Sequence, residues 1–460
     1  MSVAADPTAF ATHADHTPSA TAPLLPEEDP FYLPPAMIGQ LRPGAVVRAR
    51  EVELALFGRV AQKISAWQLL YRTCDLDDTP EVAVTTVLLP WGADPTAARP
   101  LVSFQCAIDA VASKCLPSYA FRRGARAAGA IPQLELPLIA GALASGWAVS
   151  VPDHEGTGGQ FGAAREPGYR ALDGIRAALA FEPLGLGTST PVALWGYSGG
   201  GLATAWAAEL AGEYAPELDI VGAVAGSPVG DPAAAFVRMN GGLFAGFAAV
   251  FTAGLCRAYP ELDRLLRSRL DADYLRLMAA AESTTTFPLL YRFARRNLDD
   301  HCTGGLAGLL DAPELQRILA DIRPGDRAPA MPLLVLQGVY DEVIAVADVD
   351  AHVDRYVAAG VHVRYLRDRL STHLPLQFIG APVIIDWLSD RFGNRALAPN
   401  AVETVWSVAF SKRAVSGHLR LALLSARMLF GLPIRQRRQV NPPSDVHRLS
   451  LRSTLRNPLS

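Results

Sequence analysis

The sequence predicts an α/β protein in which a mostly parallel sheet is covered by helices on both faces and a helical cap is inserted between two strands. Short runs that are apolar throughout recur along the chain, which is typical of strands buried on both faces. Segments of helical length separate these runs. Between Pro228 and about Pro329 there are helical periods and no good strand, and this interruption predicts the cap.

The individual elements follow from these patterns in chain order. Strands are expected at Val82–Leu89, Leu101–Phe104, Trp147–Val151, Pro191–Leu194, Ile220–Ala225, Leu333–Leu336 and, as the last, His362–Tyr365. Helices are expected at Leu134–Ser145, Tyr169–Phe181, Gly201–Tyr214 and Ala381–Arg391. Within the cap, Gly241–Cys256 is strongly apolar and Leu262–Ala280 is charged and amphipathic.

These elements divide the chain into five expected parts. Residues 1–28 are rich in Ala, Thr, Pro and Asp without periodicity, and we expect a flexible leader there. Residues 29–230 and 329–392 are expected to form the two parts of the core, and residues 231–328 the helical cap between them. Residues 393–460 are expected to form a basic amphipathic extension beyond the core.

Composition and charge exclude several classes of protein. Half of the 460 residues are apolar, so the chain can bury a large core and is neither fibrous nor disordered as a whole. Lys and Arg number 42 against 45 Asp and Glu, and the net charge of −3 gives no bulk attraction for nucleic acid. The five cysteines form no Cys-x-x-Cys pair, which argues against a disulfide scaffold and a structural zinc site. No feature of the sequence indicates an obligate protein partner.

From the sequence as given we expect neither a signal peptide nor a membrane span. The first 30 residues have neither a positive n-region nor an apolar h-region. No segment reaches the roughly 18 uninterrupted apolar residues that a membrane span needs. The sequence alone therefore leaves three options open: a cytosolic protein, a start that is trimmed or wrongly placed, and export by another route.

The sharpest local signal is Gly196-Tyr197-Ser198-Gly199-Gly200, which lies between the run Pro191–Leu194 and the expected helix Gly201–Tyr214. Gly-x-Ser-x-Gly between a strand and a helix is a nucleophile elbow. The glycines are needed because the turn is tight and flanking side chains would clash with the strand and the helix. The serine oxygen is exposed at the helix N-terminus, where backbone N–H groups can stabilise an oxyanion. A bare pentapeptide match is weak, and its context makes Ser198 the candidate nucleophile.

A nucleophile elbow predicts an acid and then a histidine further along the chain. Asp341 follows the strand Leu333–Leu336, and His373 follows the strand that starts at His362, so both fall at the carboxyl ends of strands. His154 precedes the serine, which is the wrong order, and His362 lies inside a strand. The competing candidates are Glu342 and Asp368 for the acid, and His154, His301 and His362 for the base.

Further motifs extend over most of the chain. Before the elbow they are Asp29-Pro30-Phe31-Tyr32 with Pro34-Pro35, Pro43-Gly44, Asp109 with Cys115-Leu116-Pro117-Ser118-Tyr119, Asp153-His154-Glu155-Gly156 and Leu172-Asp173-Gly174-Ile175-Arg176. After it they are Tyr214-Ala215-Pro216-Glu217-Leu218, Asn240-Gly241-Gly242 followed by Phe244-Ala245-Gly246-Phe247, Asp341-Glu342 and His373-Leu374. In this order, over roughly residues 29–390, the motifs resemble the secretory lipase family, the α/β-hydrolases typified by the fungal lipase A type.

The resemblance implies an α/β-hydrolase fold with a helical cap and a triad of Ser198, Asp341 and His373. It also implies an oxyanion hole formed by the Gly199 backbone N–H and by Asp109. A carboxyl group donates to an oxyanion only when protonated, which requires that burial raise its pKa, and the neighbours of Asp109 are apolar. Two alternatives stay open: the backbone N–H of Asp109 contributes instead, or Asp109 is a structural hydrogen-bond acceptor.

Two positions depart from the family's pattern. The family usually ties the cysteine that matches Cys115 to a cysteine of the cap, but Ser283–Pro288, where that partner is expected, has none. Cys302 or Cys106 could substitute, or Cys115 could be free. A proline commonly follows the acid motif, and this chain has Ala345 there, which leaves the acid assignment intact and makes the turn less typical.

The C-terminal extension is strongly basic. Residues 395–460 contain 11 Lys or Arg against Glu403 and Asp445, a local charge of +9, whereas the rest of the chain has 31 basic and 43 acidic residues, or −12. A helix expected at Ala414–Phe430 has two sets of residues at helical spacing: Val415, Leu419, Leu423, Ala426 and Phe430, which are apolar, and Arg413, Arg420 and Arg427 on another face. Such a helix can lie on an anionic membrane, or it can pack on the acidic body. Residues 435–460 are expected to be disordered.

These features predict a serine carboxylic ester hydrolase, similar to a triacylglycerol lipase, that acts on lipid-like acyl esters without a metal or organic cofactor. The apolar segment Gly241–Cys256 suits a cap that covers an acyl chain and opens at a lipid surface. Asp153 and Glu155 are expected to be structural rather than catalytic. The rival functions are an acyltransferase with the same triad and a catalytically silent lipid-binding protein on the hydrolase fold.

Two expectations concern the chain as a whole. The resembling family is mostly secreted, but this sequence leaves the compartment unassigned. Residues 29–388 hold the expected sheet, cap and triad, so truncation after about Gly393 is expected to spare hydrolysis of a soluble ester.

Overall fold

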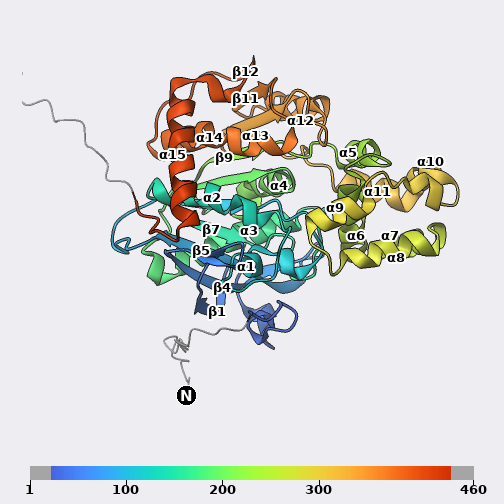
Figure 1. Ribbon diagram of the computed structural model, residues 1–460, viewed down its shortest axis with the longest axis horizontal. Helices are drawn as coiled ribbons and strands as arrows, with labels where there is room; N and C mark the ends of the chain where they lie inside the picture. The colour runs from blue at the N-terminus through green and yellow to red at the C-terminus, as the bar shows by residue number, and fades with distance from the viewer. Residues whose placement is uncertain (1–21, 437–460) are drawn as a thin grey trace, which may run out of the picture.

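A ten-stranded sheet forms the centre of the protein in the computed structural model, which describes residues 22–436 (Figure 1). Its strand order is β1-β4-β5-β7-β6-β8-β9-β10-β11-β12, and a separate hairpin pairs β2 with β3. The strands from β6 to β12 pair in parallel, whereas β1, β4 and β5 continue the sheet through antiparallel pairs. The strands are β1 (Val46–Glu51), β2 (Ala55–Leu56), β3 (Val60–Ala61), β4 (Ile64–Cys74), β5 (Pro80–Pro90), β6 (Leu101–Gln105), β7 (Ala148–Pro152), β8 (Val192–Tyr197), β9 (Ile220–Gly226), β10 (Leu333–Gly338), β11 (Val363–Asp368) and β12 (Ala401–Val405).

Helices cover both faces of this sheet, because the central strands are apolar on both sides. One face carries α2 (Pro132–Ala144), α14 (Ala381–Phe392) and α15 (Lys412–Leu429), whose buried side chains share one hydrophobic cluster with it. The other face carries α3 (Glu166–Ala180), α4 (Gly199–Tyr214) and α12 (Val346–Ala358) in a second cluster. Two short helices, α1 (Pro117–Ala120) and α13 (His373–Ile379), lie in loops at strand ends. The predicted α/β class, with a mostly parallel sheet between helices, is confirmed.

Seven helices lie between β9 and β10, where the sequence predicts the cap, and we call them the helical insertion. They are α5 (Pro232–Met239), α6 (Ala245–Ala258), α7 (Pro260–Arg269), α8 (Ala272–Ala281), α9 (Thr286–Phe293), α10 (Gly305–Leu310) and α11 (Pro313–Asp321). Most of their buried side chains form a third hydrophobic cluster, which reaches α4 through Leu202 and Trp206. The amphipathic stretch Leu262–Ala280 is two helices rather than one, because Asp271 caps α8 by accepting from the Tyr274 N–H at 2.8 Å.

The strand predictions are correct for every apolar run and wrong about where the sheet ends. β11 is not the last strand, because β12 pairs in parallel with it and extends the sheet. β12 is short and mostly exposed, so it lacks the apolar run that marks the central strands. β1 and β4 were not predicted, since both carry polar residues between apolar ones, as strands in antiparallel pairs commonly do.

The C-terminal part of the described chain is therefore packed onto the sheet and its helices. After β12, α15 lies against α2 and α14, and Gly417 permits a close approach, since a Cβ there would lie 2.4 Å from the Pro382 Cβ. Truncation after Gly393 would remove β12 and uncover α14, so we expect it to lower stability, while its effect on hydrolysis of a soluble ester stays a prediction. Of the expected leader (1–28), residues 1–21 lie outside the described residues, and so do residues 437–460 of the segment expected to be disordered (435–460). No helix among residues 22–436 is long and apolar enough to cross a membrane.

Candidate active site

The turn from β8 to α4 has the geometry of a nucleophile elbow. Ser198 has φ 55° and ψ −120°, a strained conformation for a residue with a side chain. A Cβ at Gly196 would lie 2.1 Å from the Gly200 carbonyl oxygen, and a Cβ at Gly200 would lie 2.0 Å from the Gln105 carbonyl oxygen. Both positions therefore require glycine, and the turn places Ser198 at the N-terminus of α4.

Ser198, His373 and Asp341 form one line of hydrogen bonds. The Ser198 Oγ lies 2.9 Å from the His373 Nε2, and the His373 Nδ1 lies 2.8 Å from the Asp341 Oδ2. Asp341 comes from the loop after β10, and His373 is the first residue of α13, after β11. Ser198, Asp341 and His373 follow three different strands, and the structure brings these three predicted residues together.

The Asp341 carboxylate is held from both sides. Its Oδ1 accepts the backbone N–H groups of Val343 and Ile344 at 2.9 and 2.8 Å, so this turn forms although Ala345 replaces the usual proline. Burial raises the pKa of Asp341, but the charge of His373 and the hydrogen bonds to the carboxylate outweigh it, and the pKa lies below its usual value. Asp341 is therefore ionised at neutral pH and fixes the orientation of the imidazole.

Two neighbours of Asp341 were missed by the sequence analysis. The Ser227 hydroxyl donates to the Asp341 Oδ2 at 2.7 Å and lies 3.2 Å from the His373 Nδ1. The Gln337 side-chain amide also donates to the Asp341 Oδ2, at 3.2 Å. Ser227 directly follows β9, so its place at the carboxyl end of a parallel strand was the signal that could have indicated it.

The competing acids and bases make other contacts. Glu342 accepts the backbone N–H of His373 at 3.0 Å, and Asp368 accepts backbone N–H groups of its own loop and of Val408. Among the histidines, His154 contacts the Cys106 carbonyl oxygen, His301 contacts Asp271, and His362 contacts the Ala398 carbonyl oxygen. None of these five side chains contacts Ser198 within the described chain.

Asp109 lies beside the start of α4, with its carboxyl group buried. A Cβ at Gly199 would lie 1.8 Å from the Asp109 Oδ1, and this oxygen has no hydrogen-bond partner within residues 22–436. Burial raises the pKa of Asp109 to about 7, although the charge of His373 opposes the shift. A large part of this carboxyl is therefore protonated at neutral pH and can donate a hydrogen bond next to Ser198.

The backbone N–H of Asp109 is already occupied, which contradicts the alternative that it serves the oxyanion. It donates to the Glu155 Oε1 at 3.0 Å, and this bond holds Asp109 at its positive φ of 45°. Glu155 is buried, and burial raises its pKa well above the usual value. Asp153 accepts the Ser118 backbone N–H at 3.0 Å and makes no hydrogen bond to the triad residues within the described chain. These contacts fit the structural roles expected for Asp153 and Glu155.

The candidate nucleophile, Ser198, is almost fully covered by the rest of the chain. Ser198 is only 8% exposed and His373 only 1%. Phe161 borders the site, since a Cβ at Gly199 would lie 3.2 Å from its ring, and Phe161 packs edge-on against Phe251 of α6 with ring centroids 5.4 Å apart. The apolar helix α6 of the helical insertion therefore reaches the surroundings of Ser198 through one aromatic pair.

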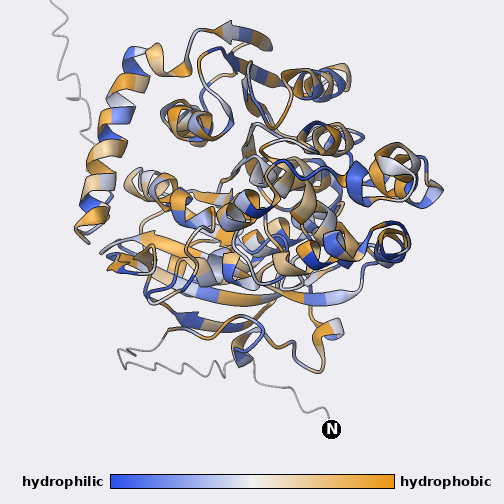
Figure 2. Cartoon of the chain, turned by 45° about the vertical axis from the view of Figure 1, so that its right-hand side comes forward, coloured by the Kyte–Doolittle hydropathy of each residue, from blue (hydrophilic) through white to orange (hydrophobic). Residues whose placement is uncertain are grey.

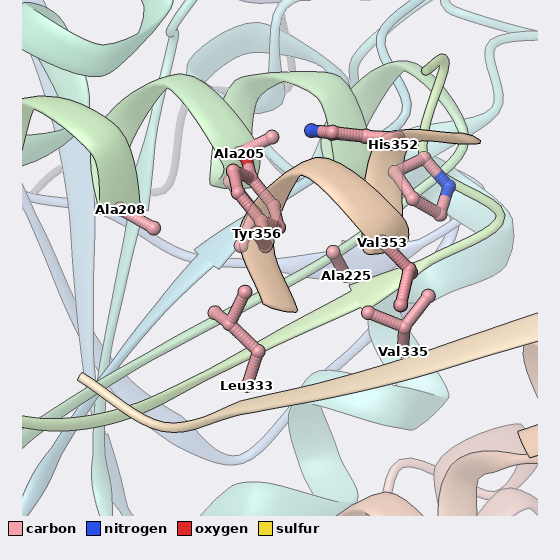
Figure 3. A pocket seen from close by; sticks show the side chains of 10 residues that line it. Ala205, Ala208, Ala225, Leu333, Val335, His352, Val353 and Tyr356 are labelled. Atoms are coloured by element: carbon pink, nitrogen blue, oxygen red, sulfur yellow. The ribbon is translucent and has the colours of Figure 1, made fainter. Parts of the chain in front are cut away.

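Two cavities within residues 22–436 are lined by other residues. Figure 3 shows an apolar one of about 10 Å³ between α4, β9, β10 and α12, which has room for about one water molecule. An open pocket of about 580 Å³ lies between the loops around Arg59, Lys114 and Arg126 and the residues Ser283–Thr285 of the helical insertion. No member of the triad lines either cavity.

Within the described residues, the cysteines form no disulfide and belong to no group that could bind a metal ion. All five cysteines are free, so neither Cys302 nor Cys106 replaces the missing partner of Cys115. Within residues 22–436, no group of three or more His, Cys, Asp or Glu side chains could hold a metal ion.

Comparison with known proteins places the chain in a family. The model of the family "Secretory lipase" matches residues 121–400. The chain belongs to the secretory lipase family. The resemblance of the sequence motifs to this family is thereby confirmed.

Relatives of this lipase family differ in what their names say about activity. This chain is 47% identical to a Mycobacterium tuberculosis protein named probable inactive lipase. The match extends over 415 residues, which are 90% of this chain and 93% of the relative. The chain is 36% identical to lipase A of Arthroderma benhamiae over 80% of each chain. The crystal structure of Candida antarctica lipase A superposes with a TM-score of 0.78 at 27% identity, covering 90% of this chain and 98% of that one, and confirms the α/β-hydrolase fold.

Proposed function

We propose that this member of the secretory lipase family is a serine carboxylic ester hydrolase that acts on lipid-like acyl esters, as a triacylglycerol lipase does. The observation that carries the proposal is the line from the Ser198 Oγ through His373 to Asp341, with contacts of 2.9 and 2.8 Å. A serine hydroxyl is a weak nucleophile until a base takes its proton, and this line supplies an oriented base. The lipase and esterase names of several relatives support an ester as the substrate.

In the proposed mechanism, Ser198 attacks the ester carbonyl carbon while the His373 Nε2 takes the hydroxyl proton. Asp341 holds the imidazole with its Nδ1 proton facing the carboxylate, and it stabilises the imidazolium that forms. His373 then gives the proton to the departing alcohol oxygen. A water molecule, activated by the same nitrogen, attacks the acyl-enzyme and releases the carboxylic acid, and Ser198 regains its proton.

The negative oxygen of each tetrahedral intermediate needs donors beside Ser198. Gly199 is the first residue of α4, so its backbone N–H has no partner within the helix and is available there. The buried Asp109 carboxyl supplies the second donor in its protonated form, since its Oδ1 is next to Gly199 and otherwise unpaired within the described chain. We therefore assign the oxyanion hole to Gly199 and Asp109.

The lipid-like character of the substrate rests on the helical insertion. α6 is apolar on most of its surface and contacts the loop that covers Ser198 through Phe251 and Phe161. When this cover opens, the exposed surface next to the nucleophile is aromatic and aliphatic, which suits an acyl chain better than a polar acid. The division of the chain into core, cap (231–328) and C-terminal extension (from 393) stays a proposal of the same kind.

A catalytically silent protein is the one rival that an observation favours, because a relative at 47% identity is named probable inactive lipase. Against it stands the complete line of three residues in this chain, with the glycines that the elbow requires. A protein that only binds lipid has no use for an imidazole held 2.9 Å from the serine by a buried carboxylate.

Hydrolysis of p-nitrophenyl esters over a range of acyl lengths tests the proposal. We expect turnover by the wild-type protein, and loss of at least about three orders of magnitude in kcat for Ser198→Ala with folding intact. Ser389→Ala, on the exposed side of α14, is the matched control and should leave kcat unchanged. A Ser198→Ala variant that keeps more than about a tenth of the activity would contradict the assignment of the nucleophile.

Trapping with a fluorophosphonate separates the active protein from the silent one. An active Ser198 gains one phosphonyl group, seen in the intact mass, and Ser198→Ala gains none. A wild-type protein that is folded, unlabelled and inactive on every ester would overturn the proposal. Addition of an alcohol to the same assay detects acyl transfer, since a transferase forms a new ester instead of the free acid.

A further inference from the structure

α15 has two apolar faces, of which only one is used by the body of the protein. The inner face buries Ala414, Leu424 and Met428 against the hydrophobic cluster that includes α2 and α14. The outer face consists of the apolar set that the sequence places at helical spacing. Its side chains are in contact with solvent: Val415, Leu419, Leu423, Ala426 and Phe430.

The outer face is unusually apolar for a protein surface. Leu419 is 64% exposed, Leu423 68% and Phe430 79%. Single exposed apolar side chains are normal, but a continuous row on one helix marks a surface that something else covers. Figure 2 shows α15 at the edge of the molecule with hydrophobic and hydrophilic bands along its length.

The charges on α15 all have one sign. No Asp or Glu occurs between Glu403 and residue 436. Arg413, Arg420 and Arg427 repeat every seven residues, so they follow one side of the helix, next to the outer apolar face. All three are exposed, and none has a carboxylate partner within 4 Å among the described residues. The helix therefore offers an apolar surface bordered by unneutralised cations.

We propose that the outer face of α15 docks the protein on an anionic lipid bilayer, with the helix lying in the plane of the membrane surface. The leucines and Phe430 would enter the boundary between headgroups and acyl chains, and the arginines would contact lipid phosphates. A second copy of this chain fits less well, because two such helices facing each other would bring their arginines together. The positive charge beside the apolar face therefore favours an anionic bilayer over a second copy of the chain.

The place of α15 in the fold separates this docking surface from the site. Figures 1 and 2 show α15 along one side of the molecule and the helical insertion at the opposite side. A protein docked through α15 keeps the insertion away from the bilayer that holds it. Docking therefore acts as a tether, and hydrolysis of a soluble ester is independent of it.

Flotation of the full chain with lipid vesicles tests the proposal. We expect the wild-type protein to float with vesicles of phosphatidylcholine containing about a third phosphatidylglycerol at low salt, and much less with phosphatidylcholine alone. The triple variant R413Q/R420Q/R427Q should partition about a hundredfold less, since each lost charge at an anionic surface is worth about 1 kcal/mol, or roughly fivefold. The double variant L419S/L423S should partition into the same vesicles at least about tenfold less than the wild type.

A matched pair controls for the loss of exposed apolar area in general. L33S/M37S removes two side chains outside α15 that are each 59% exposed, and its flotation should equal that of the wild type. All variants should hydrolyse a soluble short-chain ester at the wild-type rate. If the wild-type protein proves catalytically inactive, all variants should instead have the wild-type melting temperature. This second readout keeps docking distinguishable from the proposed hydrolase activity.

Three results would overturn the proposal. One is absence of the wild-type protein from the floating fraction with anionic vesicles. Another is equal binding of wild type and L419S/L423S, which would place the docking surface elsewhere. The third is a wild-type dimer in sedimentation velocity that L419S/L423S converts to monomer, because the occupant would then be a second copy of the chain.

Discussion

At the carboxyl ends of β8, β9, β10 and β11, polar side chains are buried and paired, whereas α15, which packs on α2 and α14, leaves leucines in solvent. Asp341 accepts five hydrogen bonds or close contacts, from Val343, Ile344, Ser227, Gln337 and His373. On α15 the neighbouring residues Leu423 and Leu424 are 68% and 7% exposed. The polar groups of the first region find their partners within the chain, whereas the outer face of α15 is exposed among the described residues, and we propose that a bilayer covers it.

The two regions should respond differently when a side chain is removed. In a fully paired polar site, removing one partner leaves buried groups unsatisfied, and the cost is large and specific. On a solvent-exposed apolar face, removing a side chain costs the free protein almost nothing, and the effect is seen only when the covering partner is present.

The largest effect is expected for Asp341→Asn. Its Oδ1 still accepts the Val343 and Ile344 N–H groups, so the loop keeps its shape. The amide group that replaces the Oδ2 favours the imidazole tautomer with the proton on Nε2, which cannot accept the Ser198 proton. We expect kcat on a soluble ester to fall about ten-thousandfold, with little change in melting temperature.

Glu342→Gln is the control for Asp341→Asn, since Glu342 contacts only the backbone N–H of His373 in this region. Its amide oxygen can accept the same bond, and kcat should stay within about threefold of the wild type. Equal losses in the two variants would mean that the Asp341 carboxylate is not the group that orients His373.

Asp109 should make activity depend on pH on the alkaline side. The pKa of this buried carboxyl is about 7, and only the protonated form can donate to an oxyanion. As pH rises above 7 the carboxylate form dominates, so kcat should fall by about tenfold per pH unit. Asp109→Asn carries an amide donor at every pH, and its alkaline decline should disappear, while Asp109→Leu should lose about a hundredfold or more.

The pH profile is measured as kcat with a soluble ester from pH 6 to 10. An Asp109→Asn variant that keeps the wild-type alkaline decline would show that another group causes it. In that case Asp109 would be a structural acceptor, the alternative that the sequence left open.

Much of the sheet and of the triad could be predicted because both depend on local patterns. Apolar runs such as Ile220–Ala225 are buried on both faces, and the glycines around Ser198 are required by close approach of the backbone. The chain order of Ser198, Asp341 and His373 follows from the order of the strands. These predictions needed no knowledge of the contacts between elements that are distant in the sequence.

The features that could not be predicted depend on distant contacts. Ser227 lies 114 residues before Asp341 in the chain, and its place after β9 indicates an edge of the sheet but not a contact with Asp341. β12 is an exposed edge strand, and its pairing with β11 becomes visible only when the sheet is assembled. For α15, the sequence showed an apolar set on one face, but the body packs against a different set, which includes Leu424 and Met428.

Leu424→Ala and Leu423→Ala compare the two faces of α15 directly. Leu424 is buried, so its truncation should lower the free energy of unfolding by about 2–3 kcal/mol through lost burial and a cavity. Leu423 is exposed, and its truncation should change that free energy by less than about 0.5 kcal/mol. Denaturant unfolding of both variants measures the difference, and equal losses would show that the outer face is already covered in solution.

Ser227→Ala is expected to have the smallest effect and to test whether pairing around Asp341 is cooperative. The variant loses the hydroxyl that donates to the Asp341 Oδ2, while His373 and Gln337 still contact that oxygen. Because the Ser227 bond helps to hold the pKa of Asp341 below its usual value, its loss moves that pKa upward.

We therefore expect kcat for Ser227→Ala to fall about tenfold with KM unchanged. The acid limb of the kcat profile, where protonation of Asp341 removes activity, should shift to higher pH. Ser227 has a positive φ of 41° that alanine tolerates about as well as serine, so the fold should be kept. A lower kcat without a shifted acid limb would assign Ser227 to packing alone. An unchanged kcat would mean that Gln337 and the two backbone N–H groups suffice to hold the carboxylate, and that the paired site tolerates loss of one partner as easily as the outer face of α15 does.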